Sequence, residues 1–323
     1  MTPAPLAAPL AARLTAVAGP LFFPVTAYGP DGGVDLKAFR AHVRAGVDAG
    51  AAAVFACCGT GEFHALTPQE FRLVVAAAVE ETAGAVPVVA GAGYGTALAV
   101  QFARLAEEAG ADGLLAMPPY LVVADQRGLL AHYTALAAAT RLETIVYQRD
   151  NAVFTPETVL ALARTPGIVG LKDGHGDLDL MQRVLGAVRT GAPDADFLYF
   201  NGLPTAELTS LAYRGIGVTL YSSAVFAFAP DIALAFYRAL SFGEAELTDA
   251  LLDHFYRPLV ELRAKGRGYA VSLVKAGVRL GGLDVGTVRT PLTEPPAAHI
   301  EELAALIATG RALLEKHRTG ERA

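Results

Sequence analysis

The sequence predicts an α/β fold, specifically a (β/α)8 TIM barrel with a C-terminal helical appendage. Three observations support this prediction. Short apolar runs alternate with amphipathic stretches, in the order strand, helix, strand, helix. The runs are apolar throughout, which is typical of parallel strands buried on both faces. Eight such runs occur, whereas an open doubly wound sheet usually has about five to seven strands, so a closed barrel is favoured.

Each strand is expected at a run rich in Val, Phe, Leu and Ile. The eight runs are Leu21 to Ala27, Ala52 to Cys58, Pro87 to Gly93, Gly113 to Pro118, Thr144 to Arg149, Ile168 to Asp173, Phe197 to Asn201 and Gly217 to Ser222. Helices are expected between them. Thr67-Pro68-Gln69-Glu70 matches a capping box with proline at the first helical position, and Thr155-Pro156-Glu157 is a second start of this kind.

The chain is predicted to divide into three parts. Residues 1–19 form a loose N-terminal leader, residues 20–242 the barrel, and residues 243–323 the helical region. The strand pattern stops after Phe242, and helices are expected at about Glu244 to Lys265, Ala270 to Leu280 and Ala297 to Lys316. The leader lacks a basic segment before its apolar residues, so a secretory signal peptide is not expected.

Composition limits the function classes. The chain of 323 residues is 53% hydrophobic, and its net charge of −6 is spread without any basic run. We therefore expect no nucleic-acid partner and no anionic membrane surface. The apolar stretch from Thr82 to Ala103 is broken by Pro87 and several glycines, so it does not predict a membrane span. The two cysteines are adjacent and give no disulfide framework, which favours a reducing cytoplasm.

Candidate site residues are the polar side chains at the carboxyl ends of the predicted strands, where barrel active sites lie. They are Gly59-Thr60-Gly61-Glu62 after the second strand, Tyr147 and Arg149 on the fifth, Lys172-Asp173 on the sixth, Gly202 after the seventh, and Ser222-Ser223 after the eighth. Their concentration at one end of the predicted barrel indicates a site for a small molecule.

Lys172 is the sharpest candidate because it ends an apolar strand in a chain with only five lysines. Burial favours the neutral amine, which is the nucleophile that forms a Schiff base with a ketone. The alternative is a structural lysine that forms an ion pair with Asp173 or another nearby carboxylate. Position alone leaves both interpretations open.

Three further residues have similar pairs of interpretations. Tyr147 is either a proton-transfer group at the barrel mouth or a core tyrosine with one hydrogen bond. Thr60 lies in a glycine-flanked corner. This corner is either a site whose backbone amides approach a substrate carboxylate or a simple strand-to-helix turn. Arg149 either binds a second carboxylate or is a surface or ion-pair residue.

Other patterns carry little weight. Gly91-Ala92-Gly93-Tyr94-Gly95 does not have the spacing of a dinucleotide-binding loop, so no nucleotide cofactor is expected. The seven histidines show no ligand spacing, so no metal is expected either. His64 and His175 near strand ends are either acid–base groups or solvated loop residues. Cys57 and Cys58 are expected to pack as small apolar side chains.

Together these residues resemble the dihydrodipicolinate synthase and N-acetylneuraminate lyase family, barrel enzymes that form an imine with a 2-keto acid. The resemblance covers nearly the whole chain and rests on Phe23-Pro24-Val25-Thr26, Gly59-Thr60-Gly61-Glu62, Met117-Pro118-Pro119-Tyr120, Tyr147 and Gly170-Leu171-Lys172-Asp173. It implies that Lys172 forms the imine, Tyr147 moves protons, and Gly59 with Thr60 holds the carboxylate beside the ketone. It also implies a homo-oligomer, either a dimer or a tetramer, and no cofactor.

Departures from the founding members narrow the resemblance. The corner has one threonine where the synthase usually has two, and Gly202-Leu203-Pro204-Thr205 replaces the acidic motif of the lyase. Four motifs resemble those of the 5-dehydro-4-deoxyglucarate dehydratases: Gly59-Thr60-Gly61-Glu62-Phe63, Lys-Asp-Gly-x-Gly-Asp at 172–177, Gly202-Leu203-Pro204-Thr205-Ala206-Glu207 and Tyr221-Ser222-Ser223-Ala224-Val225-Phe226. Members of this subgroup convert a six-carbon keto diacid to 2,5-dioxopentanoate. A diacid implies a second carboxylate site. The substrate-binding candidates beyond the Gly59-Thr60 corner are Arg149, Asn151, Gly202, Thr205, Ser222 and Ser223.

Two other functions stay open. An aldolase for a related 2-keto-3-deoxy sugar acid would use the same imine but break a carbon–carbon bond. A non-catalytic barrel could bind a keto acid as a sensor. A sensor needs neither Lys172 nor Tyr147, so their joint presence favours an enzyme.

Overall fold

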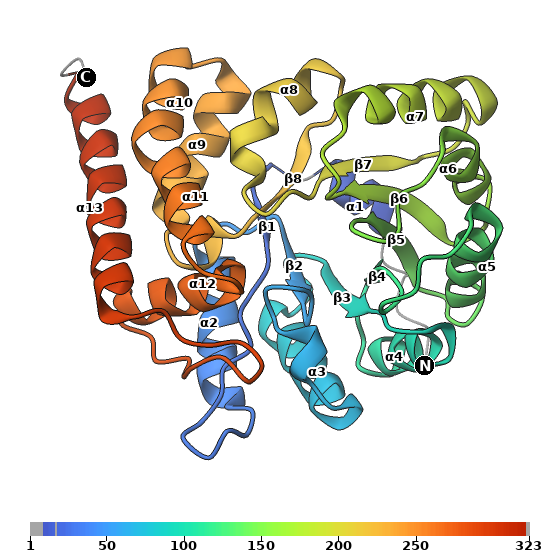
Figure 1. Cartoon of the computed structure of the whole chain (residues 1–323), viewed down its shortest axis with the longest axis horizontal. Helices are drawn as coiled ribbons and strands as arrows, with labels where there is room; N and C mark the ends of the chain where they lie inside the picture. Colours follow the sequence, from blue (N-terminus) through green and yellow to red (C-terminus); the bar gives the residue numbers. More distant parts are fainter. Residues whose placement is uncertain (1–8, 17, 321–323) are drawn as a thin grey trace, which may run out of the picture.

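Eight parallel strands form a closed barrel in the computed structural model, which describes residues 9–16 and 18–320 (Figure 1). Each strand pairs with the next in sequence, and β8 closes onto β1. The (β/α)8 prediction is therefore confirmed. The strands are β1 Leu21–Phe22, β2 Ala53–Ala56, β3 Val88–Ala92, β4 Gly113–Ala116, β5 Glu143–Gln148, β6 Ile168–Asp173, β7 Leu198–Asn201 and β8 Leu220–Ser223.

Helices surround the barrel in the predicted alternation. Those that precede or follow strands are α1 Leu10–Thr15, α2 Leu36–Asp48, α3 Pro68–Thr82, α4 Thr96–Glu108, α5 Gln126–Ala137, α6 Pro156–Ala163, α7 Leu178–Gly191, α8 Ser210–Gly215 and α9 Pro230–Phe242. The capping box at the start of α3 is confirmed, because Thr67 and Glu70 each bond the other's backbone. Thr155 caps α6 as expected.

The barrel interior is a packed core rather than a channel. Its side chains include Phe23, Phe55, Ile145 and Phe200, and Phe23 stacks on Phe55 with ring centroids 4.6 Å apart. A larger apolar layer lies between the strands and the surrounding helices. Both faces of the strands are thus buried, which explains why their sequences are uniformly apolar.

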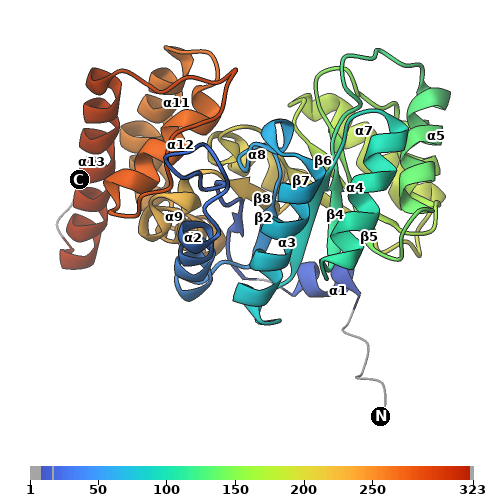
Figure 2. The ribbon, with the colours of Figure 1, turned by 90° about the horizontal axis from the view of Figure 1, so that it is seen from below.

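Part of the predicted loose leader is ordered. Helix α1 lies across one end of the barrel (Figure 2) and packs Leu10 and Leu14 into the interior cluster. Glu143 of β5 accepts a hydrogen bond from the Ala11 amide at 2.9 Å. The expectation of a loose segment was wrong for Leu10–Thr15, because two leucines spaced one helical turn apart fill the barrel end. Residues 1–8 and 17 of the predicted leader lie outside the described residues.

The C-terminal helices cover one side of the barrel (Figures 1 and 2). They are α10 Ala245–Leu251, a π-helical turn Leu252–Tyr256, α11 Arg257–Ala264, α12 Tyr269–Leu280 and α13 Ala297–Thr319. The single helix expected from about Glu244 to Lys265 is therefore interrupted. Pro258 cannot donate a backbone hydrogen bond and its ring crowds the preceding turn, which accounts for the wider π-helical turn just before it.

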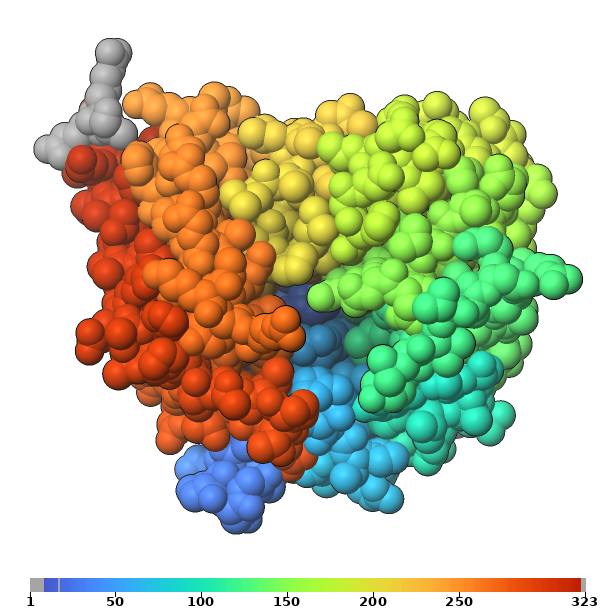
Figure 3. All heavy atoms as spheres, in the orientation of Figure 1, coloured from blue at the N-terminus to red at the C-terminus, as the bar shows by residue number. Residues whose placement is uncertain are grey.

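The space-filling view shows a hollow at the centre of one face, among segments from the barrel and the C-terminal region (Figure 3). None of the helices in the described part of the chain has the length and apolar character needed to cross a membrane.

Candidate active site

Lys172 and Tyr147 lie side by side because of the strand register. Tyr147 of β5 pairs with Lys172 of β6, which in turn pairs with Phe200 of β7. The Lys172 side chain is almost fully buried, at 4% exposure. Its Nζ atom lies 3.9 Å from the centre of the Tyr147 ring and 5.3 Å from that of Phe23. The lysine is thus held against aromatic faces inside the barrel mouth.

Lys172 has no carboxylate within ion-pair distance among residues 9–16 and 18–320. Its hydrogen bond is a long one to the Gly202 carbonyl, at 3.4 Å. The neighbouring Asp173 carboxylate faces elsewhere: it accepts hydrogen bonds from Gln148 at 3.0 Å, the His175 amide at 2.9 Å and the Tyr213 hydroxyl. The alternative of an ion pair with Asp173 was therefore wrong.

The Tyr147 hydroxyl lies between a carbonyl and two cations. It donates a hydrogen bond to the Gly202 oxygen at 2.9 Å and accepts one from Arg149 at 3.4 Å. Burial alone raises the pKa of Tyr147, but the positive charges of Lys172 and Arg149 outweigh it, and the net pKa is below its ordinary value. The surroundings therefore favour loss of the phenolic proton, which suits a group that moves protons.

Glycine is required at position 202. A Cβ atom there would lie 2.6 Å from Lys172 Cγ and 2.7 Å from Nζ, so any larger residue would displace the lysine. The same residue supplies the carbonyl shared by Lys172 and Tyr147. Gly202 thus sets the position of both side chains through its backbone and its lack of a side chain.

A cavity of about 200 Å³ opens at this point, at the carboxyl ends of the strands. It brings together seven of the predicted site residues: Gly59, Thr60, Tyr147, Arg149, Lys172, Gly202 and Ser222. Residues that the sequence did not single out for a site, including Phe23, Leu203, Pro204, Ala270 and Val271, complete its wall. The last two come from α12, so the C-terminal region forms part of the site.

Three predicted binding residues do not line this cavity. Asn151 donates hydrogen bonds to the carbonyls of Pro119, at 2.8 Å, and Val122. Thr205 accepts a hydrogen bond from Arg263. Ser223 is buried and donates to Glu207 at 2.5 Å. Each of these polar groups already has a protein partner, as is usual for polar groups removed from solvent.

The remaining candidates behave as the simpler interpretation expects. His64, in the 3-10 turn Phe63–Ala65, and His175, in the loop after β6, are both exposed. Cys57 and Cys58 are buried, and Cys58 lies against the cavity. Burial raises the pKa of Cys58 to about 12, although Lys172 acts in the opposite direction, so its thiol stays protonated at neutral pH.

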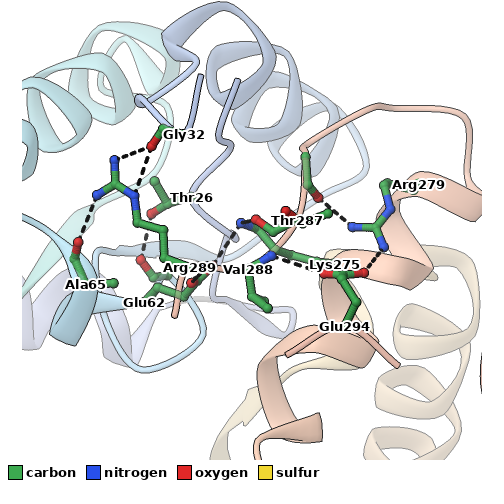
Figure 4. Close-up of polar contacts among 12 residues, drawn as sticks. Thr26, Gly32, Glu62, Ala65, Lys275, Arg279, Thr287, Val288, Arg289 and Glu294 are labelled. Atoms are coloured by element: carbon green, nitrogen blue, oxygen red, sulfur yellow. Dashed lines mark hydrogen bonds and ion pairs between the residues drawn. The ribbon is translucent and has the colours of Figure 1, made fainter. Parts of the chain in front are cut away.

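Glu62, the last residue of the Gly59-Thr60-Gly61-Glu62 motif, is not part of the cavity wall and lies among polar residues of the C-terminal region (Figure 4). It forms an ion pair with Lys275 of α12 at 2.8 Å, and both side chains are fully buried. It also accepts a hydrogen bond from the Arg289 amide at 2.9 Å. Thr26 donates to the Gly61 carbonyl at 2.6 Å and connects the same corner to the segment that follows β1. The motif's acid therefore fastens the C-terminal region to the barrel mouth.

The described residues contain no group of three or more His, Cys, Asp or Glu side chains that could hold a metal ion.

The described residues form a parallel barrel whose mouth holds a tyrosine and a buried lysine without a carboxylate partner, an arrangement typical of barrel enzymes with a lysine nucleophile. Residues 16–309 match the model of the dihydrodipicolinate synthetase family, so the chain belongs to that family. The chain is also similar in fold to dihydrodipicolinate synthase from Oceanobacillus iheyensis, with a TM-score of 0.85 and 23% identity over 94% of this chain and 99% of that one.

Curated relatives extend the comparison. A protein of Streptomyces griseus named probable 5-dehydro-4-deoxyglucarate dehydratase is 83% identical over 96% of this chain and 97% of the relative. One of Streptomyces avermitilis, named probable 5-dehydro-4-deoxyglucarate dehydratase 1, is 74% identical over 96% of this chain and 98% of its own length. A protein of Bradyrhizobium diazoefficiens, also named probable 5-dehydro-4-deoxyglucarate dehydratase, is 45% identical over 90% of this chain and 91% of the relative.

Proposed function

We propose that the chain is a Schiff-base hydro-lyase that converts 5-dehydro-4-deoxyglucarate to 2,5-dioxopentanoate. One keto diacid yields one dioxo acid, one water and one carbon dioxide, so the reaction needs no oxidant or reductant. The observation that carries the proposal is the buried Lys172 amine, which has no carboxylate partner in the described part of the chain and lies 3.9 Å from the Tyr147 ring. The names of the relatives point to the same reaction.

The first steps depend on Lys172 and Tyr147. The Lys172 amine attacks the keto carbon, and loss of water gives an imine. The imine acidifies the adjacent CH2 group, and Tyr147 takes one of its protons. The electron pair forms an enamine, which expels the β-hydroxyl as water once that oxygen is protonated. Arg149 assists because its charge, like that of Lys172, stabilises the phenolate form of Tyr147.

The second half of the reaction releases carbon dioxide. After dehydration, a carbon–carbon double bond connects the imine to the carbon that bears the distal carboxylate. The bond to that carboxylate breaks, its electrons move through the double bond to the imine nitrogen, and carbon dioxide leaves. Tautomerisation of the resulting enol gives the aldehyde, and a solvent proton added to the enamine carbon restores the imine. Hydrolysis of that imine returns free Lys172.

Binding is assigned to the other residues around the cavity. Gly59 and Thr60 hold the carboxylate beside the imine, and Gly202 keeps Lys172 and Tyr147 in register. Arg149 and Ser222 face the rest of the substrate from the same cavity. Asn151, Thr205 and Ser223 support these loops through the contacts described above. The proposed reaction uses no metal and no nucleotide, and the family resemblance favours a cytoplasmic homo-oligomer, a dimer or a tetramer.

The test is a product analysis. The purified protein is incubated with 5-dehydro-4-deoxyglucarate, and carbon dioxide, the five-carbon semialdehyde and pyruvate are measured with and without a chelator. The proposal expects equal amounts of carbon dioxide and semialdehyde in both conditions. Pyruvate instead would show an aldolase, and binding without turnover would show a non-catalytic barrel. Either result, or loss of activity on chelation, contradicts the proposal.

A further inference from the structure

A second, smaller chamber borders the catalytic cavity. Its volume is about 30 Å³, which is room for one or two water-sized groups. Three residues, Pro204, Ala224 and Ala270, line both spaces. The chamber thus begins where the catalytic cavity ends, on the side formed by the loops after β7 and β8 and by α12.

Arg263 of α11 lines this chamber and has an unusual set of partners. It is half-buried and donates a hydrogen bond to the Thr205 hydroxyl. No carboxylate of residues 9–16 or 18–320 lies within ion-pair distance of it. Burial lowers the pKa of Arg263, the Glu207 charge opposes this, and the charge of Arg149 lowers the pKa further. A guanidinium in these surroundings is stabilised by an anion.

Glu207 also lines this chamber. It is 1% exposed, and its Oε1 atom accepts a hydrogen bond from Ser223 at 2.5 Å. Its Oε2 atom is buried and has no hydrogen-bond partner in the described part of the chain. A buried polar atom of this kind costs free energy unless a ligand or water pairs with it. When protonated, this carboxyl can donate a hydrogen bond to an anion in the chamber.

The rest of the chamber wall is apolar and includes Val225, Phe228, Leu259 and Leu273. Charge interactions are stronger in such a low-dielectric space than in water. An apolar wall also favours a neutral leaving group over the carboxylate from which it forms. The chamber therefore combines a cation, a hydrogen-bonding acid and an apolar wall in a volume suited to one carboxylate.

We propose that this chamber holds the distal carboxylate of a keto diacid bound at Lys172, and that Arg263 is the residue that selects diacids over mono-acids. The inference rests on the proposed function, because it takes the Lys172 imine as the anchor of the substrate. It assigns a specificity residue to the C-terminal region, whereas the sequence pattern placed all binding residues on the barrel loops.

The experiment compares two keto acids that lack the leaving hydroxyl, the diacid 2-oxoadipate and the mono-acid 2-oxohexanoate. Each is titrated against the full-length protein, the imine is reduced with borohydride, and the adduct is measured by mass spectrometry. The variants are Arg263→Gln and Arg263→Lys. Arg267→Gln, an exposed arginine three residues after Ala264, is the matched control. A thermal melt of each variant monitors folding.

Arg263→Gln is expected to weaken half-saturation by 2-oxoadipate by about 10- to 100-fold, as expected for loss of a hydrogen bond to a charged group. Its half-saturation by 2-oxohexanoate should stay within about twofold of wild type. Arg263→Lys keeps the charge without the planar fork, so its half-saturation by 2-oxoadipate should lie between those of wild type and Arg263→Gln. This variant also covers the case in which Arg263→Gln fails to fold. Arg267→Gln should leave half-saturation by both keto acids unchanged.

If Arg263→Gln weakens the binding of both keto acids equally, or leaves the preference for the diacid unchanged, the chamber assignment alone is overturned. A preference that depends on Arg149→Gln but not on Arg263→Gln would place the second carboxylate in the main cavity and also overturn it. Failure of the wild-type protein to form any adduct would overturn the Schiff-base function together with this inference.

Discussion

Two lysines are buried in this protein, and their surroundings differ in one respect. Lys275 pairs with Glu62 at 2.8 Å, donates to the Thr287 carbonyl at 2.8 Å and lies 4.0 Å from the Tyr28 ring centre. Lys172 also lies over a tyrosine ring, at 3.9 Å, but it has no carboxylate partner in the described residues. The other three lysines, Lys37, Lys265 and Lys316, are exposed.

This difference in pairing is the basis for our proposal that Lys275 is structural and Lys172 is the reactive lysine. Burying a charge costs several kcal/mol unless a partner compensates it, so an unpaired buried lysine persists only where the fold can support the cost. At Lys275 the compensating carboxylate fastens α12 to the corner after β2 (Figure 4). At Lys172 no carboxylate of the described residues takes this position, and the proposed function uses the amine as the nucleophile for a ketone in the cavity.

The largest expected effect is on turnover. Lys172→Ala removes the imine nucleophile, so kcat should fall by about 10⁴-fold or more, as is typical when a covalent catalyst is removed. Stability should not fall by more than about 1 kcal/mol, because no ion pair is lost. Turnover assays and urea denaturation of the same preparation measure both. A strongly destabilised Lys172→Ala protein would make Lys172 structural, like Lys275.

Tyr147→Phe should lower kcat by about 10²- to 10⁴-fold, the usual contribution of a positioned acid–base group. The ring stays over Lys172, so the imine should still form and be trapped by borohydride. Tyr133→Phe is the matched control, because the Tyr133 hydroxyl is buried without a hydrogen-bond partner among the described residues. If both substitutions leave kcat unchanged, another group moves the protons.

Lys275→Met should destabilise the fold by about 3–5 kcal/mol, because it leaves the Glu62 carboxylate buried without its cation. Glu62→Gln should have a similar effect from the other side of the pair. The double substitution removes both charges and should regain part of the loss, which urea denaturation of the three variants will show. Additive losses would mean that the two side chains contribute independently and that the ion pair is not what fastens α12.

Glu207 is a buried acid, and its protonation should make the stability of the fold depend on pH. Burial raises the pKa of Glu207 from 4.5 to about 7, although Ser223 opposes the shift. The folded state therefore binds the proton more tightly, so stability from this group is full below about pH 4.5 and declines as pH rises to about 7. The loss should be on the order of 3 kcal/mol. Urea denaturation at several pH values should show this loss of stability in the wild-type protein and not in Glu207→Gln. Identical pH profiles of stability for the two proteins would contradict the prediction.

Much of the fold could be predicted from the sequence because strands and helix starts are determined by residues close together in the chain. Uniformly apolar runs gave the eight strands, and the Thr67 capping box gave the start of α3. The residues that end the strands gave seven members of the cavity wall. The ion pair of Lys172 with Asp173 could also have been excluded, because neighbouring side chains on a strand point to opposite faces.

The rest depends on long-range contacts that sequence spacing does not encode. Leu10 and Leu14 fill the barrel end only because the strands close around them. Arg263 and Glu207 meet at one chamber although 55 positions in sequence lie between them, and the partner of Glu62 lies more than 200 residues away at Lys275. Polar residues in helices beyond the barrel gave no sequence signal for a site.

Trapping of the imine tests the central claim most directly. The protein is incubated with its keto diacid substrate and borohydride, digested, and the modified peptide is identified by mass spectrometry. We expect the adduct on the Lys172 peptide and none on the Lys275 peptide, which is an internal control with an equally buried amine. An adduct at Lys275 or at an exposed lysine, or no adduct from a protein that turns over the substrate, would contradict the account.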